Sequence, residues 1–441
     1  MGLFYDSEHY VSFDLTIPRN TSRPIRSRPT SSLSTLPHIP LELVLLILQH
    51  AHDKRTYASA SLVCRAWSLP AQQFLFHNVS LSSQSACLSF LHAISSSPAL
   101  ASSVRSLSAS IDHNQPYGLS QRTFAKAFSL CLNLDELRVS LYGCAEPGKD
   151  IVGAPDVARM RRLAPSWDDE SLDLLSQGPG STLTKLRFCN WSDNRDSLGQ
   201  LLGVFPSVQH LVLTGTPPEL PAAADSTPLP PSLALRSLRV NFQSYPSPDY
   251  FQWLLHTSSL NSIAFDRVPP APVLELLLNT HRESLESLYL PSFPVVPQTP
   301  ASSNAKGAEN ALISSLASMS AMKSLAIESP ESFLRVLASK SLPASLETLS
   351  FGLEMDNRAG SASLRSIVDA VRTKESLTEL RVMMFDVEDP AEARGRGIGG
   401  GEKGECKHLA SLKMLCATRG IELGVERDVR RWRERVFECM H

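Results

Sequence analysis

The sequence lacks an excess of charge of either sign. Its 441 residues include 42 Lys and Arg against 44 Asp and Glu, which gives a formal net charge of −2 at pH 7. General affinity for nucleic acid depends on a large positive field over the protein surface. We therefore expect no nucleic-acid partner.

Long apolar runs are absent as well. The most apolar stretch, from Leu41 to Leu48, is about one third as long as the roughly 20 residues that a transmembrane helix needs. The first residues do not follow the pattern of a signal peptide either. We expect no membrane partner and no secretion.

Paired cysteine motifs are missing. The chain has eight cysteines without a CxxC pair. Scattered cysteines without a secretion signal are typical of buried thiols in a reducing compartment. We therefore expect the protein to be cytoplasmic, nuclear or both.

Motifs of catalysis and metal binding are also lacking. No His pair stands at metal-ligand spacing with a third donor, and no Ser lies in a GxSxG turn. The segment Gly143–Asp150 nearly matches a phosphate-binding loop, but Asp150 replaces the required Ser or Thr, and Pro147 removes a backbone N–H. Gly395, Gly397 and Gly400 match GxGxxG inside a glycine-rich linker rather than at a strand-to-helix turn. We expect no catalytic residue, metal or cofactor.

The most informative stretch that is present runs from Leu36 to Val79. Pro37 and Pro40 favour a helix that begins just after them. The run Leu41–Leu48 then places apolar side chains all around that helix. Such a helix must be covered on more than one side, by its own domain and by a partner protein or the rest of the chain.

Two more short helices are expected in the second half of this stretch. Val63 and Trp67 are four residues apart, a spacing that places them on one helical face. Pro70 can begin a third helix, which would carry Phe74 and Phe76.

The order of these residues resembles an F-box, a three-helix module. The resemblance implies binding to the Skp-type adaptor of cullin-based ubiquitin ligases. The residues expected to bind the adaptor are Leu36, Pro37, Ile39, Pro40, Leu43, Ile47, Leu62, Val63 and Trp67. The alternative is an ordinary helical cap on a larger repeat domain that serves as a scaffold.

After Val79 the sequence changes to a repeated phrase, apolar-x-x-apolar-x-apolar. Successive phrases begin at residues 183, 208, 235, 260 and 285, a spacing that matches the leucine-rich-repeat period of about 20–29 residues. Helical patterns lie between them, as at 249–255 and 272–278. The fold class expected is α/β, an irregular leucine-rich-repeat solenoid that follows the F-box, similar to fungal-type substrate receptors. An Asn or Cys ladder is missing, so we expect irregular turns.

These patterns divide the chain into four parts. We expect a disordered basic, Ser- and Pro-rich tail at 1–35, the F-box at 36–80, repeats at 81–425 and a capping helix at 426–441 that covers the end of the solenoid. Disordered insertions are expected near 216–232, 291–310 and 389–405.

One column of side chains should face away from the core. Side chains alternate along a strand, so the residue between the last two apolar positions of each phrase should lie on the concave face. This outward column is Arg138, Arg187, Val212, Arg239, Ala264, Tyr289, Ala326, Ser350 and Arg381. Arginine and tyrosine are enriched at protein-binding anchors. The residues expected to bind substrate are Arg138, Lys185, Arg187, Arg239, Tyr289 and Arg381.

The function expected is that of a substrate-recognition subunit. The F-box would bind the adaptor, and the repeat surface would hold a protein with an acidic or phosphorylated segment. The chain itself would catalyse nothing, because its task is to raise the local concentration of substrate. The rivals are the repeat scaffold with a plain helical cap and a nucleotide-binding enzyme built on the Gly143 loop.

Overall fold

The computed structural model describes residues 39–51, 53–145, 162–220, 233–256, 258–294, 312–340, 342–354, 359–385, 407–438 and 440. The expected tail at 1–35 lies outside these residues, as do the insertion at 389–405 and most of the other two. The chain forms two compact units, unit 1 at Met1–Val208 and unit 2 at Gln209–His441. Each unit is described by itself below.

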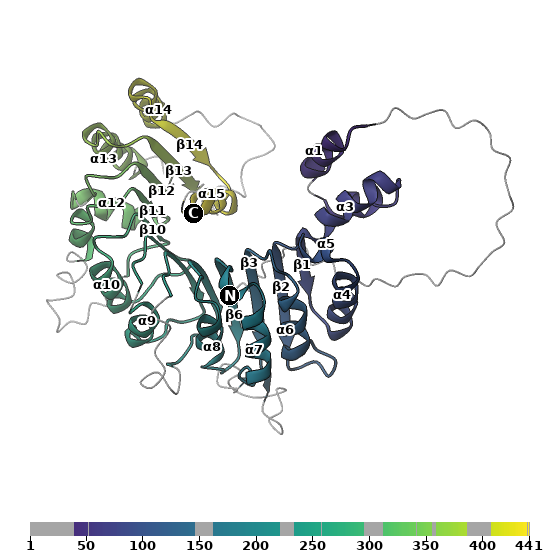
Figure 1. Cartoon of the computed structure of the whole chain (residues 1–441). Coiled ribbons are helices and arrows are strands. Elements are labelled where there is room, and N and C mark those ends of the chain that lie inside the picture. Colours follow the sequence, from purple (N-terminus) through teal and green to yellow (C-terminus); the bar gives the residue numbers. More distant parts are fainter. Residues whose placement is uncertain are drawn as a thin grey trace, which may run out of the picture. The chain divides into compact units, whose positions relative to one another are not determined.

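The first described elements of unit 1 are the helices α1 (Leu41–Ala51), α2 (Lys54–Ala60) and α3 (Arg65–His77), of which Figure 1 labels α1 and α3. The carboxylate of Asp53 begins α2 by accepting hydrogen bonds from the backbone N–H groups of Arg55 and Thr56 at 3.2 and 3.1 Å. The expected limits of the second and third helices are wrong. Val63 lies in a turn, and Pro70 lies inside α3 rather than at its start.

The turn at Ser61–Val63 explains this difference. The N–H groups of Leu62 and Val63 donate to the carbonyls of Ser59 and Ala60, which ends α2, and extended backbone at Cys64 then starts α3. The spacing of Val63 and Trp67 therefore does not place them on one helix. A single proline removes one hydrogen bond within α3, and the packing described below holds the helix together.

The rest of unit 1 alternates strands and helices. Its main strands pair in parallel in the order β1-β2-β3-β6, and β4 and β5 form a short antiparallel pair. The elements are β1 (Asn78–Leu81), α4 (Gln84–Ser96), α5 (Pro98–Ala101), β2 (Ser106–Asp112), α6 (Gln121–Ser129), β3 (Glu136–Tyr142), β4 (Cys144–Ala145), β5 (Arg162–Leu163), α7 (Asp169–Gln177), β6 (Lys185–Trp191) and α8 (Ser197–Val204). Strand β1 was not expected from the sequence, because it is short and only two apolar residues, Val79 and Leu81, alternate with polar ones along it.

Unit 2 also alternates strands and helices, and its described strands all run parallel. Their order follows the chain, β7-β8-β9-β10-β11-β12-β13-β14. The elements are β7 (His210–Gly215), β8 (Ser237–Phe242), α9 (Pro248–Leu255), β9 (Ser262–Phe265), α10 (Ala271–Thr280), β10 (Ser287–Leu290), β11 (Ser324–Ile327), α12 (Pro330–Ala338), β12 (Thr348–Glu354), α13 (Ala359–Thr373), β13 (Glu379–Phe385), α14 (Lys407–Arg419), β14 (Glu422–Glu426) and α15 (Val429–Glu438). The strands expected from the repeated phrase are therefore present.

The core of each unit lies between its strands and the helices that follow them. In β2 and β3 every second residue is buried, as the alternation of a strand with one covered face requires. In unit 2 the rings of Phe333 on α12 and Phe351 on β12 stack with centroids 4.2 Å apart and an interplanar angle of 9°. The apolar positions of the phrase thus form the core.

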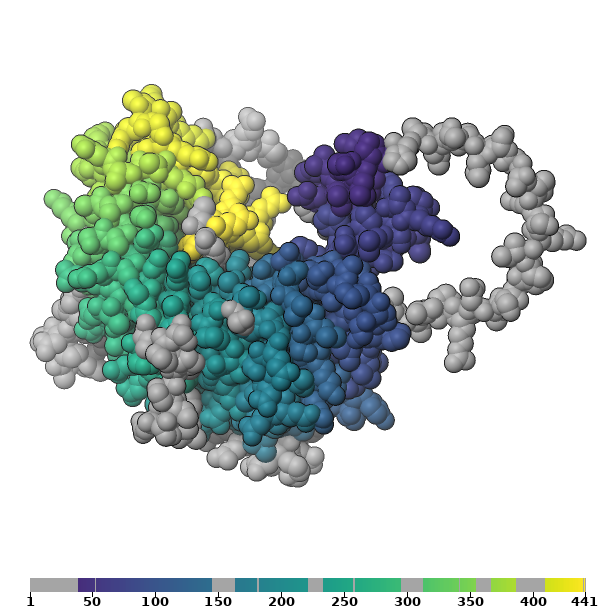
Figure 2. Space-filling model, viewed as in Figure 1, coloured from purple at the N-terminus to yellow at the C-terminus, as the bar shows by residue number. Residues whose placement is uncertain are grey.

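The C-terminal helix does not cap the end of the solenoid, as the sequence had led us to expect. Figure 1 shows α9, α10, α12 and α13 on one side of the unit 2 strands and α15 on the other. In Figure 2 this yellow segment packs against the green part of the same unit. Helix α15 therefore covers a face of the sheet rather than its end.

The expected buried thiols are found at Cys87, Cys131 and Cys416, whereas Cys64 and Cys144 are exposed. Burial raises the pKa of the Cys87 thiol to about 12, so this group stays protonated at neutral pH. Among the described residues, no helix has both the length and the hydropathy needed to cross a bilayer.

Candidate functional site

Helices α1 to α3 form a small core of their own. Val44 and Leu48, four residues apart on α1, are each 1% exposed and pack with Tyr57, Ala60 and Ala71. The half-buried side chains that complete this cluster are Ala51, Trp67, Phe74 and Leu75. Only one narrow stripe of α1 therefore contributes to the core of the three helices.

The other apolar residues of α1 face solvent. Leu43 and Ile47 are each 50% exposed. The exposed large apolar side chains of this segment are Ile39, Leu41, Leu43, Leu45, Leu46, Ile47, Leu62, Val63 and Leu69. Exposed apolar residues gathered in this way are typical of protein-interaction surfaces.

The structure separates the residues expected to bind the adaptor into two groups. Ile39, Pro40, Leu43 and Ile47 are exposed at the start of α1 or along it. Leu62 and Val63 are exposed in the turn before α3. Leu36 and Pro37 lie outside the described residues.

Trp67 belongs to neither group, because it packs against the core of the three helices. Its contacts support the fold of this module, and the exposed residues around it form the outer surface. Leu41, Leu45 and Leu46 also belong to this surface. They were not among the residues expected to bind the adaptor, although the all-round apolar pattern of α1 already indicated them.

Comparison with protein-family models agrees with this geometry. Residues 36–82 match the family described as F-box-like. The search for relatives among curated proteins found no match. The chain therefore contains a helical F-box-like region, followed by an α/β array of parallel strands.

The outward column of unit 1 is aligned by strand register. Ser108, Arg138 and Arg187 stand side by side on β2, β3 and β6. The carboxylate of Glu136 pairs with both guanidinium groups, at 3.0 Å from Arg138 Nε and 2.6 Å from Arg187 Nε. Burial opposes ionisation of Glu136, but the two arginines outweigh it and lower its pKa. Glu136 thus fixes both arginines in place.

Basic side chains gather on this face of unit 1. Arg138 and Arg187 both contact Glu136, and Lys185, in register with Glu136, is exposed beside them. Arg187 is also exposed, and Arg138 is half-buried. The structure therefore brings together these three residues that the sequence analysis expects to bind substrate.

The outward column of unit 2 is equally well aligned but is covered. Register places Arg239, Ala264, Tyr289, Ala326, Ser350 and Arg381 in one row. Ala264, Tyr289 and Ala326 are nonetheless buried, because Trp432 and Val436 of α15 pack on them. The expectation of an open face is therefore wrong for the middle of unit 2.

Polar contacts hold α15 on this face. Glu328 Oε2 accepts hydrogen bonds from the Tyr289 hydroxyl at 2.7 Å and from Arg433 Nε at 2.9 Å, and its Oε1 accepts from Arg433 at 2.8 Å. Burial opposes the charge of Arg433, but the hydrogen bonds to Glu328 outweigh it and raise its pKa. The pKa of Tyr289 is raised, first by burial and then by the negative charge of Glu328.

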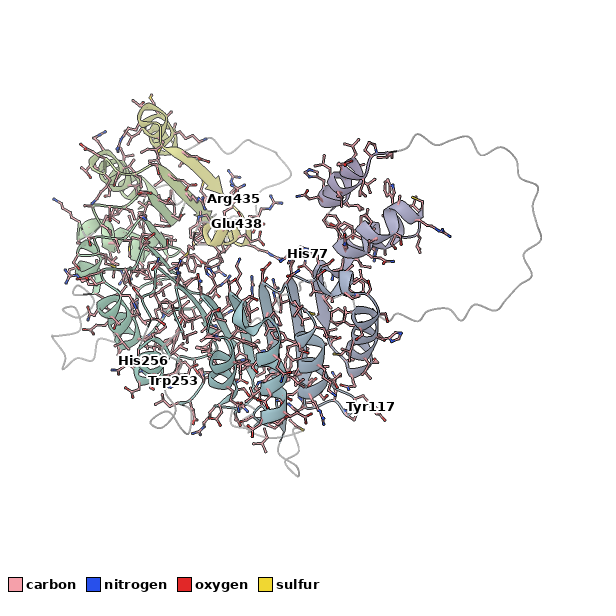
Figure 3. All side chains as sticks on the ribbon, viewed as in Figure 1. His77, Tyr117, Trp253, His256, Arg435 and Glu438 are labelled. Carbon is pink, nitrogen blue, oxygen red and sulfur yellow. The ribbon has the colours of Figure 1, made fainter. Side chains whose placement is uncertain are left out.

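The two arginines at the ends of this row are also engaged. Arg239 forms a bidentate pair with Asp266 at 2.9 Å and lies 3.8 Å from the ring centroid of Phe437, close to α15. Arg381 pairs with Glu379 and donates to the backbone carbonyl of Arg435. Figure 3 labels Arg435 and Glu438 on this helix. Arg239, Tyr289 and Arg381 therefore contact the chain itself.

Across the described ranges, no group of three or more His, Cys, Asp or Glu side chains could hold a metal ion. Of the loop that nearly matches a phosphate site, Gly143–Ala145 are described, and Cys144 and Ala145 form β4. The rest of that loop and the glycines at 395–400 lie outside the described residues.

Proposed function

We propose that this protein is the substrate-recognition subunit of an SCF-type, cullin-RING ubiquitin ligase. The F-box-like region would bind a Skp-type adaptor, and the strand array, an irregular leucine-rich-repeat solenoid, would hold a protein substrate. On this proposal the chain is not an enzyme and works in the cytoplasm, the nucleus or both. Ubiquitin transfer is carried out by other subunits, which act on a substrate held nearby.

The observation that carries the proposal is the two-sided α1 helix. Val44 and Leu48 complete the module's own core, whereas Leu43 and Ile47 are half exposed. A plain cap would bury its apolar residues within the chain. The match of residues 36–82 to the F-box-like family supports an adaptor as the partner that covers the exposed side of α1, because F-box domains typically bind adaptors of the Skp type.

The test compares Leu43→Asp/Ile47→Asp with Leu88→Asp as matched control. Leu88, on α4 outside the F-box-like region, is as exposed as Leu43 and Ile47. Burying one Leu or Ile side chain contributes about 1.5–3 kcal/mol, so each lost anchor should weaken adaptor binding by about tenfold to a hundredfold. Melting temperature should change little in either variant, because each replaced side chain faces solvent.

Adaptor co-purification is the measurement. We expect the wild type and Leu88→Asp to bring down the adaptor and the double variant to lose it. If the wild type brings down none, the region is only a helical cap and the scaffold alternative holds.

A second experiment tests whether the exposed outward face of unit 1 binds the substrate. Lys185→Glu/Arg187→Glu reverses two exposed charges there, and Arg372→Glu reverses one exposed charge on α13 as control. Proteins that co-purify after proteasome inhibition and depend on the wild-type chain should be lost with the double variant alone. Equal recovery from all three chains would show that this face does not select the substrate.

A further inference from the structure

The outward face of unit 2 holds a helix by side-chain packing. Trp432, Val436 and Met440 recur at every fourth residue along one side of α15 and its end, and each is at most 8% exposed. They pack on Ala264, Tyr289, Ala326 and Met383, which come from four different strands, β9, β10, β11 and β13. We call this surface the α15 groove. An amphipathic helix that places one apolar side into such a surface is a common form of peptide recognition.

Charge complementarity adds specificity to the packing. The α15 groove and its edge carry the carboxylates of Glu328 and Glu426, and α15 supplies Arg433 and Arg435 to pair with them. Arg239, on β8, lies over the Phe437 ring of α15. In this pair the strands supply the cation, whereas in the two ion pairs the helix supplies it. The groove thus fits a helix with an aromatic and aliphatic side that is flanked by arginines.

Helix α15 is also stabilised by local contacts at its start and along its exposed side. It follows β14 after Arg427 and Asp428, and Asp428 Oδ1 accepts hydrogen bonds from the N–H groups of Arg430 and Arg431 at 2.8 and 3.4 Å. Arg430 and Glu434, four residues apart, pair on its exposed side. Its helical structure therefore has its own N-cap and surface ion pair, and the groove contributes side-chain contacts.

We propose that the α15 groove is a helix-binding site, that α15 occupies it in cis, and that a substrate helix of the same chemistry competes with α15 for it. The identity of the competitor as a substrate rests on the function proposed above. A ligand that binds only the open state has its apparent affinity reduced by the fraction of molecules that are open. Helix α15 thereby lowers the apparent affinity of any partner that binds the α15 groove.

The experiment uses the full chain and a fluorescent peptide with the sequence of residues 427–440. Trp432→Ala in the chain weakens the resident helix and leaves the groove unchanged. Because a larger open fraction raises apparent affinity in proportion, this variant should bind the peptide at least about tenfold more tightly than the wild type. Arg431→Ala is the matched control, since its side chain is 74% exposed and faces Asp428, and it should bind like the wild type.

A charge exchange tests the site itself. In the Trp432→Ala chain, Glu328→Arg should abolish binding of the wild-type peptide, and a peptide with Arg433→Glu should restore it. No peptide binding by Trp432→Ala, or equal binding of both peptides by the exchanged chain, would overturn the proposal.

If Trp432→Ala does not fold, hydrogen exchange of the wild type tests the proposal independently. The amides of α15 should exchange through a local opening, before those of β12 and β13. Exchange of all three together would show that α15 is a fixed part of unit 2 and would overturn the proposal. Adaptor co-purification from the same samples reports on the F-box-like region separately, so its failure would leave the groove result intact.

Discussion

Gly352 lies beside the residues of the α15 groove, and replacing it with alanine should disturb the whole site. This residue lies on β12 in register with Met383 of the groove. A Cβ atom at this position would stand 1.9 Å from the backbone oxygen of Glu328 and 2.7 Å from a ring carbon of Phe385. Real Cβ atoms do not approach so closely, so the backbone after β11 must move, and with it the residue that holds Tyr289 and Arg433.

The expected cost follows from overpacking in a well-packed interior, which destabilises proteins by about 1–3 kcal/mol. Contact with a backbone atom, which cannot rotate away, places Gly352→Ala near the upper end, about 2–3 kcal/mol. For a unit of this size, 1 kcal/mol lowers the melting temperature by about 2–4 °C, so we expect a decrease of about 4–12 °C. The amides of α15 should also lose protection from hydrogen exchange.

The matched control is Gly203→Ala in α8, where a Cβ atom would meet nothing within 4 Å. That change should be neutral or stabilise by up to about 1 kcal/mol, because alanine restricts the unfolded chain and favours a helix. Thermal unfolding and hydrogen exchange measure both variants. A Gly352→Ala chain that melts with the wild type and retains α15 protection would refute the close approach on which this argument rests.

Two further predictions concern the core of unit 2. His281 is 2% exposed, its Nδ1 accepts a hydrogen bond from the Leu260 N–H at 3.3 Å, and burial lowers its pKa from 6.5 to about 4. The free energy of unfolding therefore does not suffer from protonation of His281 above pH 6.5. It should decrease by about 3 kcal/mol in all as the pH falls from 6.5 to about 4. His281→Asn should remove this pH dependence from urea unfolding measured between pH 7 and 4. Phe333→Ala removes the ring stacked on Phe351 and should cost about 3–5 kcal/mol in the same assay, whereas a loss below about 1 kcal/mol would contradict the packing described here.

Some features of the candidate site could be read from residue order. The apolar run of α1 predicted a helix that needs two covers, and the structure shows both sides, with Val44 inward and Leu43 outward. Pattern alone could not separate Val63 from Trp67, which lie in a turn and in a helix. Their spacing fits one helical face, but the hydrogen bonds that end α2 at Ser61 are made by backbone groups that every residue carries.

The amino-acid sequence by itself determined which side chains of each strand face the helices. Alternation along a strand leaves one arrangement that buries Leu238 and Val240 against the helices, and the same arrangement turns Arg239 to the other face. Only the tertiary structure decided what covers that face. The pattern of α15 specifies an apolar side with Trp432 at its centre, yet it does not say which surface that side will meet. Contacts with Tyr289 and Glu328, more than 100 residues earlier in the chain, made that choice, because shape and charge complementarity exist only once the strands have been brought together.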